Sequence, residues 1–392
     1  MNIDEILKTA LGRGASDVHL KVGVPPIFRI DGSLRALKEA PRLSPEITIE
    51  MAHSVMSEGQ RERFKNTNEM DLSYAVSGMG RFRVNVFMQR GSTTMVLRAI
   101  PHKIPTVDEL LLPKVIEKLA VEHRGLILVT GTTGSGKSTT LAAMINYINA
   151  NRNAHVITIE DPIEFLHRDK KSIINQREVG QDTGTFANAL RAALRQDPDV
   201  ILVGEMRDLE TIETALLAAE TGHLVMSTVH TLDATETINR VIAVFPPHQQ
   251  EQIRIQLASV LRGVISQRLM PKADGVGRVP AVEVLVATAR IREYVEDEHR
   301  TKEITDAIAE GHIQYGMQTF DQSLMALLGQ KLVTYEEALN QATNPDDFAL
   351  KVSGVSSTSD TTWDNFADEE GKKEGEGEGE EAEQSDSEFE LE

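Results

Sequence analysis

Four segments of the chain combine glycine, lysine, acidic residues and histidine in patterns that suit phosphate chemistry. The first is GTTGSGKST, which follows the apolar run 126–130 and precedes a helical pattern from 139 onward. A phosphate-binding loop requires this order of strand, GxxxxGK[ST] and helix. Glycines let the backbone curl so that its N–H groups point at phosphate oxygens. The N-terminus of the following helix adds about half a positive charge at the same point.

This loop predicts a nucleotide site in which each residue type has a role. We expect Lys137 to reach the β- and γ-phosphates and the hydroxyl of Ser138 to bind Mg²⁺. A structural glycine loop is the alternative, and the correct flanking segments argue against it. The candidate nucleotide-binding residues are Gly131, Thr132, Thr133, Gly134, Ser135, Gly136, Lys137, Ser138 and Thr139.

Three carboxylates follow the next apolar run, 156–159. They belong to Glu160, Asp161 and Glu164. Pro162 ends the run, so we expect the acids at the carboxyl end of a strand, where ligands bind in open α/β sheets. There they could hold hydrated Mg²⁺ or accept a proton from water. An acidic turn at the start of a helix explains the same residues equally well.

The third and fourth segments repeat this arrangement. The apolar run 200–203 is typical of a central parallel strand, and Gly204 and Glu205 follow it. An acid usually ends such a strand and supports Mg²⁺, so the glycine is atypical, and we expect Glu205 to hold Mg²⁺ through water. His223 and His230 flank a further apolar run, and their N–H donors could position a phosphate. Histidines satisfied in turns are the simpler alternative.

The composition excludes several kinds of chemistry. None of the 392 residues is cysteine, which excludes disulfides, Cys-zinc modules, iron–sulfur clusters and thiol catalysis. The net charge of −19 argues against nucleic acid as a partner. Residues 367–392 hold 13 acidic residues and two lysines, so they contribute −11 of that charge and predict a solvated, disordered tail. No apolar run approaches the ~18 residues of a membrane span, and the first residues do not resemble a secretory signal.

The patterning predicts two folded parts. Residues 1–100 mix helical spacing with alternating strands, which indicates a small α+β domain. Residues 101–113 contain three prolines and predict a linker. Residues 114–360 change to alternating strands and helices and predict an α/β domain that carries the phosphate loop. Residues 361–392 form the predicted tail.

The segments GTTGSGKST, ITIEDPIEF, LRQDPDVILVGEMRD and TGHLVMSTVHT together resemble the secretion-type hexameric ATPases of type IV pili. The similarity is greatest to the retraction motors, the PilT/PilU group, and covers about residues 1–350. It implies an α/β fold with a RecA-like P-loop ATPase core behind a small α+β, PAS-like domain. The family's names for the four segments are Walker A, Asp box, atypical Walker B and His box. The absence of cysteine favours retraction over the related assembly ATPases, which carry a tetracysteine zinc module.

The resemblance also implies site roles by position. Glu164 is the implied catalytic base, Glu205 the partner of metal or water, and His223 and His230 the His-box residues. It implies ATP and Mg²⁺ as ligands.

Arginines of the first domain complete the implied site. The strand-like segment GRFRVNVFMQR places Arg81, Arg83 and Asn85 on one face, and Arg98 follows on a later strand. In the resembling family such arginines reach the neighbouring nucleotide, which makes Arg83 or Arg98 candidates for stabilising charge, as an arginine finger does. Pairing with nearby acids on a sheet face is the alternative.

The implied function is an ATP-hydrolysing hexameric motor that powers type IV pilus retraction, by pilin disassembly, and so twitching motility. The implied partners are five further copies of the chain, an inner-membrane platform protein and a paralogous retraction ATPase, at the cytoplasmic side of the inner membrane. A regulatory nucleotide-binding protein docking on the pilus machine, or a related translocation ATPase, is the alternative. One departure lies at 288–299, where Glu293 and Glu296 replace residues of other charge.

Overall fold

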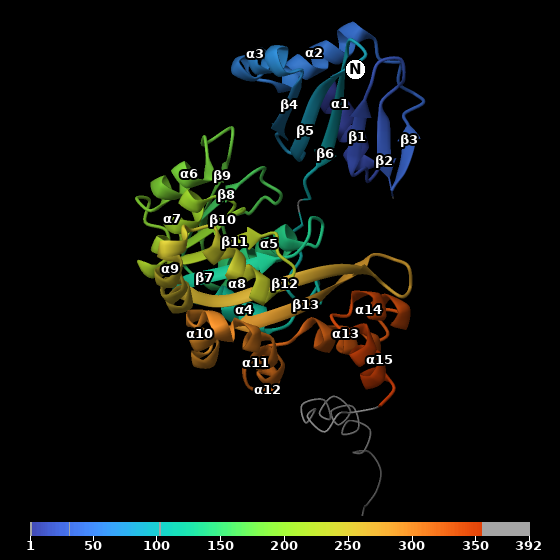
Figure 1. Ribbon diagram of the computed structural model, residues 1–392. Helices are drawn as coiled ribbons and strands as arrows, with labels where there is room; N and C mark the ends of the chain where they lie inside the picture. Colours follow the sequence, from blue (N-terminus) through green and yellow to red (C-terminus); the bar gives the residue numbers. More distant parts are fainter. Residues whose placement is uncertain (1, 31, 102, 355–392) are drawn as a thin grey trace, which may run out of the picture.

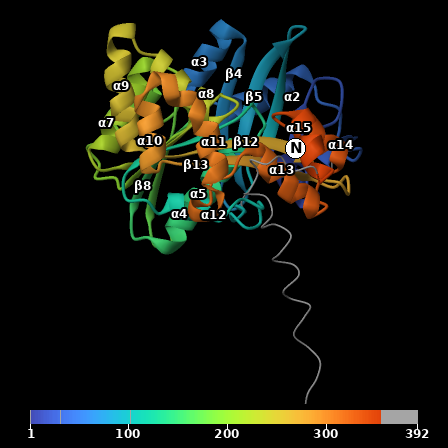
Figure 2. The same ribbon diagram turned by 60° about the horizontal axis from the view of Figure 1, so that its bottom comes forward.

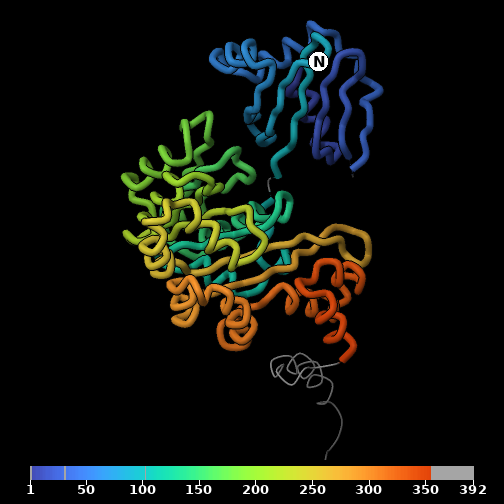
Figure 3. Tube along the Cα trace, viewed as in Figure 1, coloured from blue at the N-terminus to red at the C-terminus, as the bar shows by residue number. Residues whose placement is uncertain are grey.

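The computed structural model describes residues 2–30, 32–101 and 103–354, which form two sheet-based domains (Figure 1). The predicted tail, 361–392, lies outside the described residues. Figure 3 shows that the chain passes between the two domains once, after the last strand of the first.

The N-terminal domain contains a six-stranded antiparallel sheet in the order β3-β2-β1-β6-β5-β4. Helices pack on one face of this sheet and form one apolar core with it. The strands are β1 (Asp17–Leu20), β2 (Ile27–Ile30), β3 (Ser33–Ala36), β4 (Glu69–Val76), β5 (Gly80–Gln89) and β6 (Ser92–Ala99). The helices are α1 (Ile3–Gly12), α2 (Pro45–Val55) and α3 (Glu58–Thr67).

The alternation expected along β5 is confirmed, and it gives the sheet its two faces. Phe82, Val84 and Val86 are buried beneath the helices. Arg81 and Arg83 therefore lie on the opposite face, because successive side chains of a strand alternate. The α+β character predicted for this region is present, but helix α3 was not anticipated, since Phe64 is its only buried side chain.

The second domain is a layered α/β structure around a seven-stranded sheet in the order β13-β12-β7-β11-β10-β8-β9. Six strands are parallel and β13 is antiparallel to β12. The strands are β7 (Gly125–Thr130), β8 (His155–Glu160), β9 (Ile173–Glu178), β10 (Val200–Val203), β11 (Leu224–Val229), β12 (Leu261–Pro271) and β13 (Arg278–Val286). The helices around the sheet are α4 (Val115–Ala120), α5 (Lys137–Asn151), α6 (Phe186–Ala193), α7 (Leu209–Glu220), α8 (Ala234–Ala243), α9 (Pro247–Val260) and α10 (Ala289–Glu296).

Apolar cores on both faces explain why the central strands are continuous apolar runs. Every residue of β7, β10 and β11 is buried. Along β7, Leu126 and Leu128 face one core while Ile127 and Val129 face the other. A parallel sheet covered by helices on both faces requires this pattern.

The last helices form a separate small group on the β12–β13 hairpin. Figures 1 and 2 show α13–α15 at one end of this hairpin and α10 at the other. Phe320, Leu324 and Phe348 make their core together with Met270 of β12. The elements of this region are the 3₁₀ helix η1 (Glu298–Glu303) and the α-helices α11 (Ile304–Glu310), α12 (His312–Tyr315), α13 (Phe320–Gly329), α14 (Tyr335–Gln341) and α15 (Pro345–Val352).

The predicted linker 101–113 is only partly a free connection. Val107 and Leu112 are buried in the core that α4 and α5 share with the large sheet. The second half of this segment therefore packs on the ATPase domain. Any rotation between the domains must be taken up by the few residues before Val107.

Candidate active site

The phosphate loop leaves β7 at Gly131, where any side chain would displace neighbouring atoms of the loop or of β12. Gly131 has φ of +137°, and a Cβ there would lie 2.5 Å from the backbone oxygen of Gln267 and 2.5 Å from Ser135 Oγ. Gly136, with φ of +95°, is the N-cap of α5. The N-terminus of α5 therefore points into the space that the phosphate loop encloses, which is where a phosphate group would bind.

Lys137 lies at the centre of this loop and is 8 % exposed. Its Nζ donates hydrogen bonds to the backbone oxygens of Gly131, at 2.8 Å, and Thr132, at 3.0 Å. Burial lowers the pKa of Lys137, while the negative charges of Glu164 and Glu205 act in the opposite direction. The structure thus brings the lysine and the two acids within electrostatic reach of one another.

Glu205 follows β10 and lies beside residues from two neighbouring segments. Its carboxylate contacts Arg207 Nε at 2.8 Å, and its Oε2 lies 3.5 Å from His230 Nε2. His230 follows β11, the parallel neighbour of β10. The carboxyl ends of the two strands therefore bring Glu205 and His230 together, a contact that the motifs did not predict.

Packing explains the glycine that precedes Glu205. The Gly204 N–H donates to Ile159 O at 2.7 Å, so the end of β10 lies directly against β8. A Cβ on Gly204 would lie 3.2 Å from that oxygen and 3.4 Å from the Cα of Glu160. An aspartate in the usual position would crowd this junction, and the acid stands one residue later instead.

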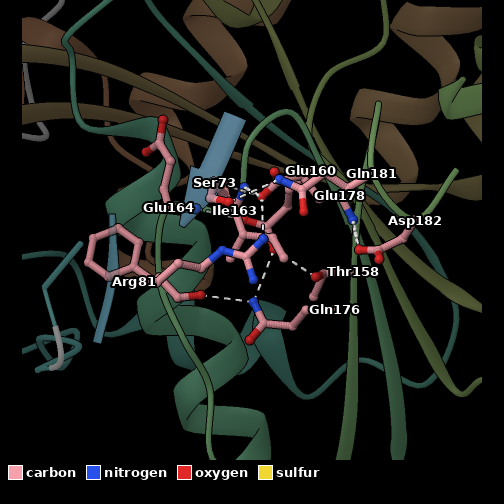
Figure 4. Close-up of polar contacts among 11 residues, drawn as sticks. Ser73, Arg81, Thr158, Glu160, Ile163, Glu164, Gln176, Glu178, Gln181 and Asp182 are labelled. Atoms are coloured by element: carbon pink, nitrogen blue, oxygen red, sulfur yellow. Dashed lines mark hydrogen bonds and ion pairs between the residues drawn. The ribbon is translucent and has the colours of Figure 1, made fainter. Parts of the chain in front are cut away.

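The three acids of the Asp box have different environments. Glu160 is held by Thr158 Oγ1, at 2.6 Å, and by Gln176 Nε2, at 3.2 Å, and burial raises its pKa. The carboxylate of Glu160 is therefore engaged inside the fold, and a role for it toward Mg²⁺ or water stays a prediction. Glu164 is exposed, and Figure 4 shows its side chain projecting away from the buried polar cluster. Desolvation and the charge of Glu205 raise the pKa of Asp161, and Arg83 opposes the rise.

The structure does not bring the two histidines together. His223 precedes β11 and His230 follows it, so the whole strand separates them, about 20 Å at 3.3 Å per residue. The Nδ1 of His223 lies 2.9 Å from Ala218 O, in the turn after α7. Within one subunit, the expectation that His223 stands beside the phosphates is therefore not met, and only His230 lies at the edge that carries the P-loop.

The two candidate arginines also differ. Arg98 donates to Asp17 Oδ1 at 2.8 Å, on the strand paired with its own, while remaining 71 % exposed. This is the ion pair on a sheet face that was the alternative for these residues. Arg83 is exposed, and its charge acts on Asp161 across the domain boundary. A role toward a neighbouring nucleotide stays a prediction for both.

A contact that the sequence did not predict joins the two domains. Arg81 Nη2 of β5 donates to Glu178 Oε2 of β9 at 2.8 Å (Figure 4). The sequence gives no local signal for this pair, because its members are 97 residues apart in different domains. Glu178 also lies outside the four sequence motifs, so no motif drew attention to it.

Comparison with known proteins decides the family. A family model described as Type II/IV secretion system protein matches residues 1–295. The chain belongs to this family. It is 46 % identical over 348 residues to the type IV pilus retraction ATPase PilT of Pseudomonas aeruginosa, covering 89 % of this chain and 100 % of PilT. It is 42 % identical over 354 residues to the type IV pilus ATPase PilU of the same organism, covering 90 % and 91 % of the two chains.

Solved structures of the family agree with this placement. A crystal structure of the pilus retraction motor PilT with bound ADP matches with a TM-score of 0.81 and 52 % identity, over 88 % of this chain and 98 % of that one. The ATPase DotB of Legionella pneumophila matches with a TM-score of 0.75 and 29 % identity, over 90 % and 96 %. The resemblance to the pilus retraction ATPases, the α/β fold class and the classification as an ATPase are therefore confirmed.

Two further observations complete the description of the family member. Among the described residues, no helix combines the length and apolar character needed to span a bilayer. The segment 288–299, which departs from the expected charges, contains all of α10, and Glu293 of this helix forms an ion pair with Arg300 of η1. The unexpected acid at that position thus has a local partner within this chain.

Proposed function

We propose that this protein is an ATP-hydrolysing motor whose hexameric ring powers the retraction of type IV pili and so twitching motility. The observation that carries the proposal is that Lys137 of a phosphate-binding loop lies close enough to Glu164 and Glu205, at the carboxyl edge of a parallel sheet, for their charges to act on it. The sequence identity of 46 % along the whole of PilT supports the same function, the retraction of pili, for this protein.

The site is suited to a nucleotide with Mg²⁺. The backbone N–H groups of the loop and the ammonium of Lys137 would hold the β- and γ-phosphates, and the cation reduces their charge when it is bound. Ser138 and Glu205 would hold Mg²⁺, the first directly and the second through water. Their hydroxyl and carboxylate oxygens are the ligand types that this cation prefers.

Glu164 is the acid best placed to accept a proton from the attacking water. Within the described part of the chain its carboxylate has no hydrogen-bond or ion-pair partner, whereas Glu160 and Glu205 are both engaged. An exposed carboxylate close enough to act on Lys137 can orient water at the γ-phosphate and take its proton. His230 contacts Glu205 and would act at the same edge of the sheet. His223 lies at the opposite end of β11, so its role would lie outside this nucleotide site.

A second cation from a neighbouring subunit would complete the site. Transfer of the γ-phosphoryl group spreads charge over three oxygens, and one lysine supplies only part of the compensation. Arg83 is exposed on the N-terminal domain, while Arg98 is held by Asp17, so we favour Arg83. A head-to-tail interface of this kind closes into a ring. The ring would work on an inner-membrane platform protein at the cytoplasmic face, alongside a paralogous retraction ATPase.

Replacing Lys137 by alanine tests the proposal at its centre. The Lys137→Ala protein should release no phosphate from ATP above background, because the β- and γ-phosphate charge loses its cation. In a bacterium that lacks its own retraction ATPase, the wild-type chain should restore twitching and Lys137→Ala should not. Tight ATP binding without hydrolysis by the wild-type protein would instead favour the regulatory alternative.

A further inference from the structure

One buried carboxylate oxygen joins the two domains to the Asp box. Glu178 ends β9, and its side chain is 3 % exposed. Its Oε2 accepts hydrogen bonds from Arg81 Nη2, at 2.8 Å, from Ser73 Oγ, at 2.8 Å, and from the N–H of Ile163, at 3.2 Å (Figure 4). Two of these donors belong to the N-terminal domain, and the third belongs to the turn that carries the acids.

The turn beside Glu164 is held from β9 on both sides. On its far side, Gln176 donates to Phe165 O at 2.8 Å and accepts from the N–H of His167 at 2.9 Å. On its near side, the N–H of Ile163 is bound by Glu178. The Glu164 N–H makes only a long bond of 3.3 Å to Glu160 Oε2. The position of Glu164 therefore depends on both β9 side chains, and only Glu178 also contacts the other domain.

Movement of the N-terminal domain would change the environment of Glu178. Withdrawing Arg81 and Ser73 removes two of the three donors, one of them the only cation that pairs with Glu178 among the described residues, from a carboxylate that is shielded from water. A buried charge without its partner is costly, so the carboxylate must then rotate toward other donors or admit water. Either change disturbs its bond to the N–H of Ile163.

The contact is also one that can be broken and remade. Arg81 Nε is buried without a hydrogen-bond partner, so the guanidinium is only partly satisfied in this arrangement. Gln181 Nε2 adds a single weak bond of 3.4 Å to Ser73 O. A fully satisfied network would resist separation more strongly.

We propose that Glu178 is a positioning residue that couples docking of the N-terminal domain to the placement of Glu164. With the domain docked, Glu178 fixes the turn and the acid is held for hydrolysis. With the domain withdrawn, the turn is released and hydrolysis slows. This inference rests on the role as base proposed above for Glu164.

Glu178→Gln in the full-length protein is the first test. Glutamine keeps the size and an acceptor oxygen but loses the charge that holds Arg81. The kcat for ATP should fall by about tenfold to hundredfold, since small misplacements of a catalytic group have effects of that size. The Kd for ATP should change by less than about twofold, because no phosphate-binding residue is altered.

Ser73→Ala is the second test, because it weakens the contact between the domains without changing any residue of the ATPase domain. It removes one hydrogen bond to a charged carboxylate while Arg81 stays in place, so it should lower kcat by up to about tenfold and speed amide hydrogen exchange at residues 161–166. Asn85→Ala is the matched control. Asn85 lies on the same face of the sheet as Ser73 but donates a hydrogen bond to Asp71 within its own domain. This change should therefore alter neither kcat nor the rate of amide exchange.

The decisive arm repeats Glu178→Gln in a Glu164→Gln background. If Glu178 acts through Glu164, the added change costs less than about twofold, because the group it positions is already lost. A loss equal to that in the wild-type background, or unchanged kcat in both Glu178→Gln and Ser73→Ala, overturns the coupling while leaving Glu164 as the base. Full turnover of Glu164→Gln alone would instead reject the base, and with it this role of Glu178.

Discussion

Glu160, Glu164 and Glu205 belong to the same edge of the parallel sheet but occupy three different environments. Glu160 is half-buried and held by hydrogen bonds, Glu205 contacts Arg207 and His230, and Glu164 is exposed. The motifs predicted that acids gather here, because they follow apolar strands. They could not rank these acids, because the pattern of residue types does not show that Thr158 and Gln176 bind Glu160 inside the fold.

Glu164→Gln should separate binding from turnover. An amide cannot accept the proton of water, so hydrolysis should fall by roughly 10²–10⁴-fold. Nucleotide affinity should stay within about twofold of wild type, because the P-loop is intact. Phosphate release and titration with a fluorescent ATP analogue measure the two quantities. Glu213→Gln, on an exposed position of α7, is the control, and unaltered turnover in Glu164→Gln would move the base to Asp161 or Glu205.

Glu283 should make stability depend on pH near neutrality. This carboxyl of β13 accepts from the N–H of Ala234 at 2.8 Å, and burial raises its pKa to about 7. The folded protein therefore keeps a proton that the unfolded chain releases above its ordinary pKa of 4.5. The stabilising effect of this proton is complete below about pH 4.5 and is lost as the pH rises to about 7.

Glu283→Gln tests this expectation in urea unfolding between pH 5 and pH 8. Glutamine resembles the neutral acid and can still accept from the N–H of Ala234. Relative to the wild type, the variant should gain stability as the pH rises from 5 to about 7, by at most a few kcal/mol, and keep that gain up to pH 8. A difference in stability that is the same at every pH would show that Glu283 does not titrate in this range.

The elements around the nucleotide site were predictable where burial alone decides their residue types. β7, β10 and β11 are buried on both faces, so their sequences are continuous apolar runs and their bounds agree with the prediction to within one residue. Helix α3 was missed because one buried phenylalanine leaves no apolar periodicity. The position of His223 was also missed, since a motif that spans a strand gives no indication of which end faces the ligand.

Two glycines of the loop after β7, Gly131 and Gly134, should tolerate alanine differently. Gly131→Ala places a Cβ 2.5 Å from the backbone oxygen of Gln267, so the loop or β12 must shift. Gly134→Ala meets no atom within 4 Å and adds only the strain of positive φ, about 1–2 kcal/mol. The Tm of Gly131→Ala should therefore be clearly lower than that of Gly134→Ala in a thermal melt. Equal Tm values would show that the exit from β7 is not constrained as described.

At the scale of the whole molecule, the two domains are joined by one short connection and by contacts centred on Glu178. Half of the predicted linker packs on the ATPase domain through Val107 and Leu112, so the N-terminal domain can rotate only about a short segment. The sequence predicted the two domains from the change in patterning. It could not predict their contact, because the pairing of Arg81 with Glu178 depends on how finished domains meet.

The most direct measurement is phosphate release from rings assembled with two different inactive subunits. One carries Lys137→Ala, and the other carries Arg83→Ala. If the arginine of one subunit completes the site of the next, some interfaces in a mixed ring pair an intact P-loop with an intact Arg83. The mixture should then hydrolyse ATP well above either parent alone, because a trans arginine contributes about 10³–10⁵ to the rate. Mixed rings that form, as shown by affinity tags on both subunits, but stay inactive at every ratio would contradict a site shared between subunits.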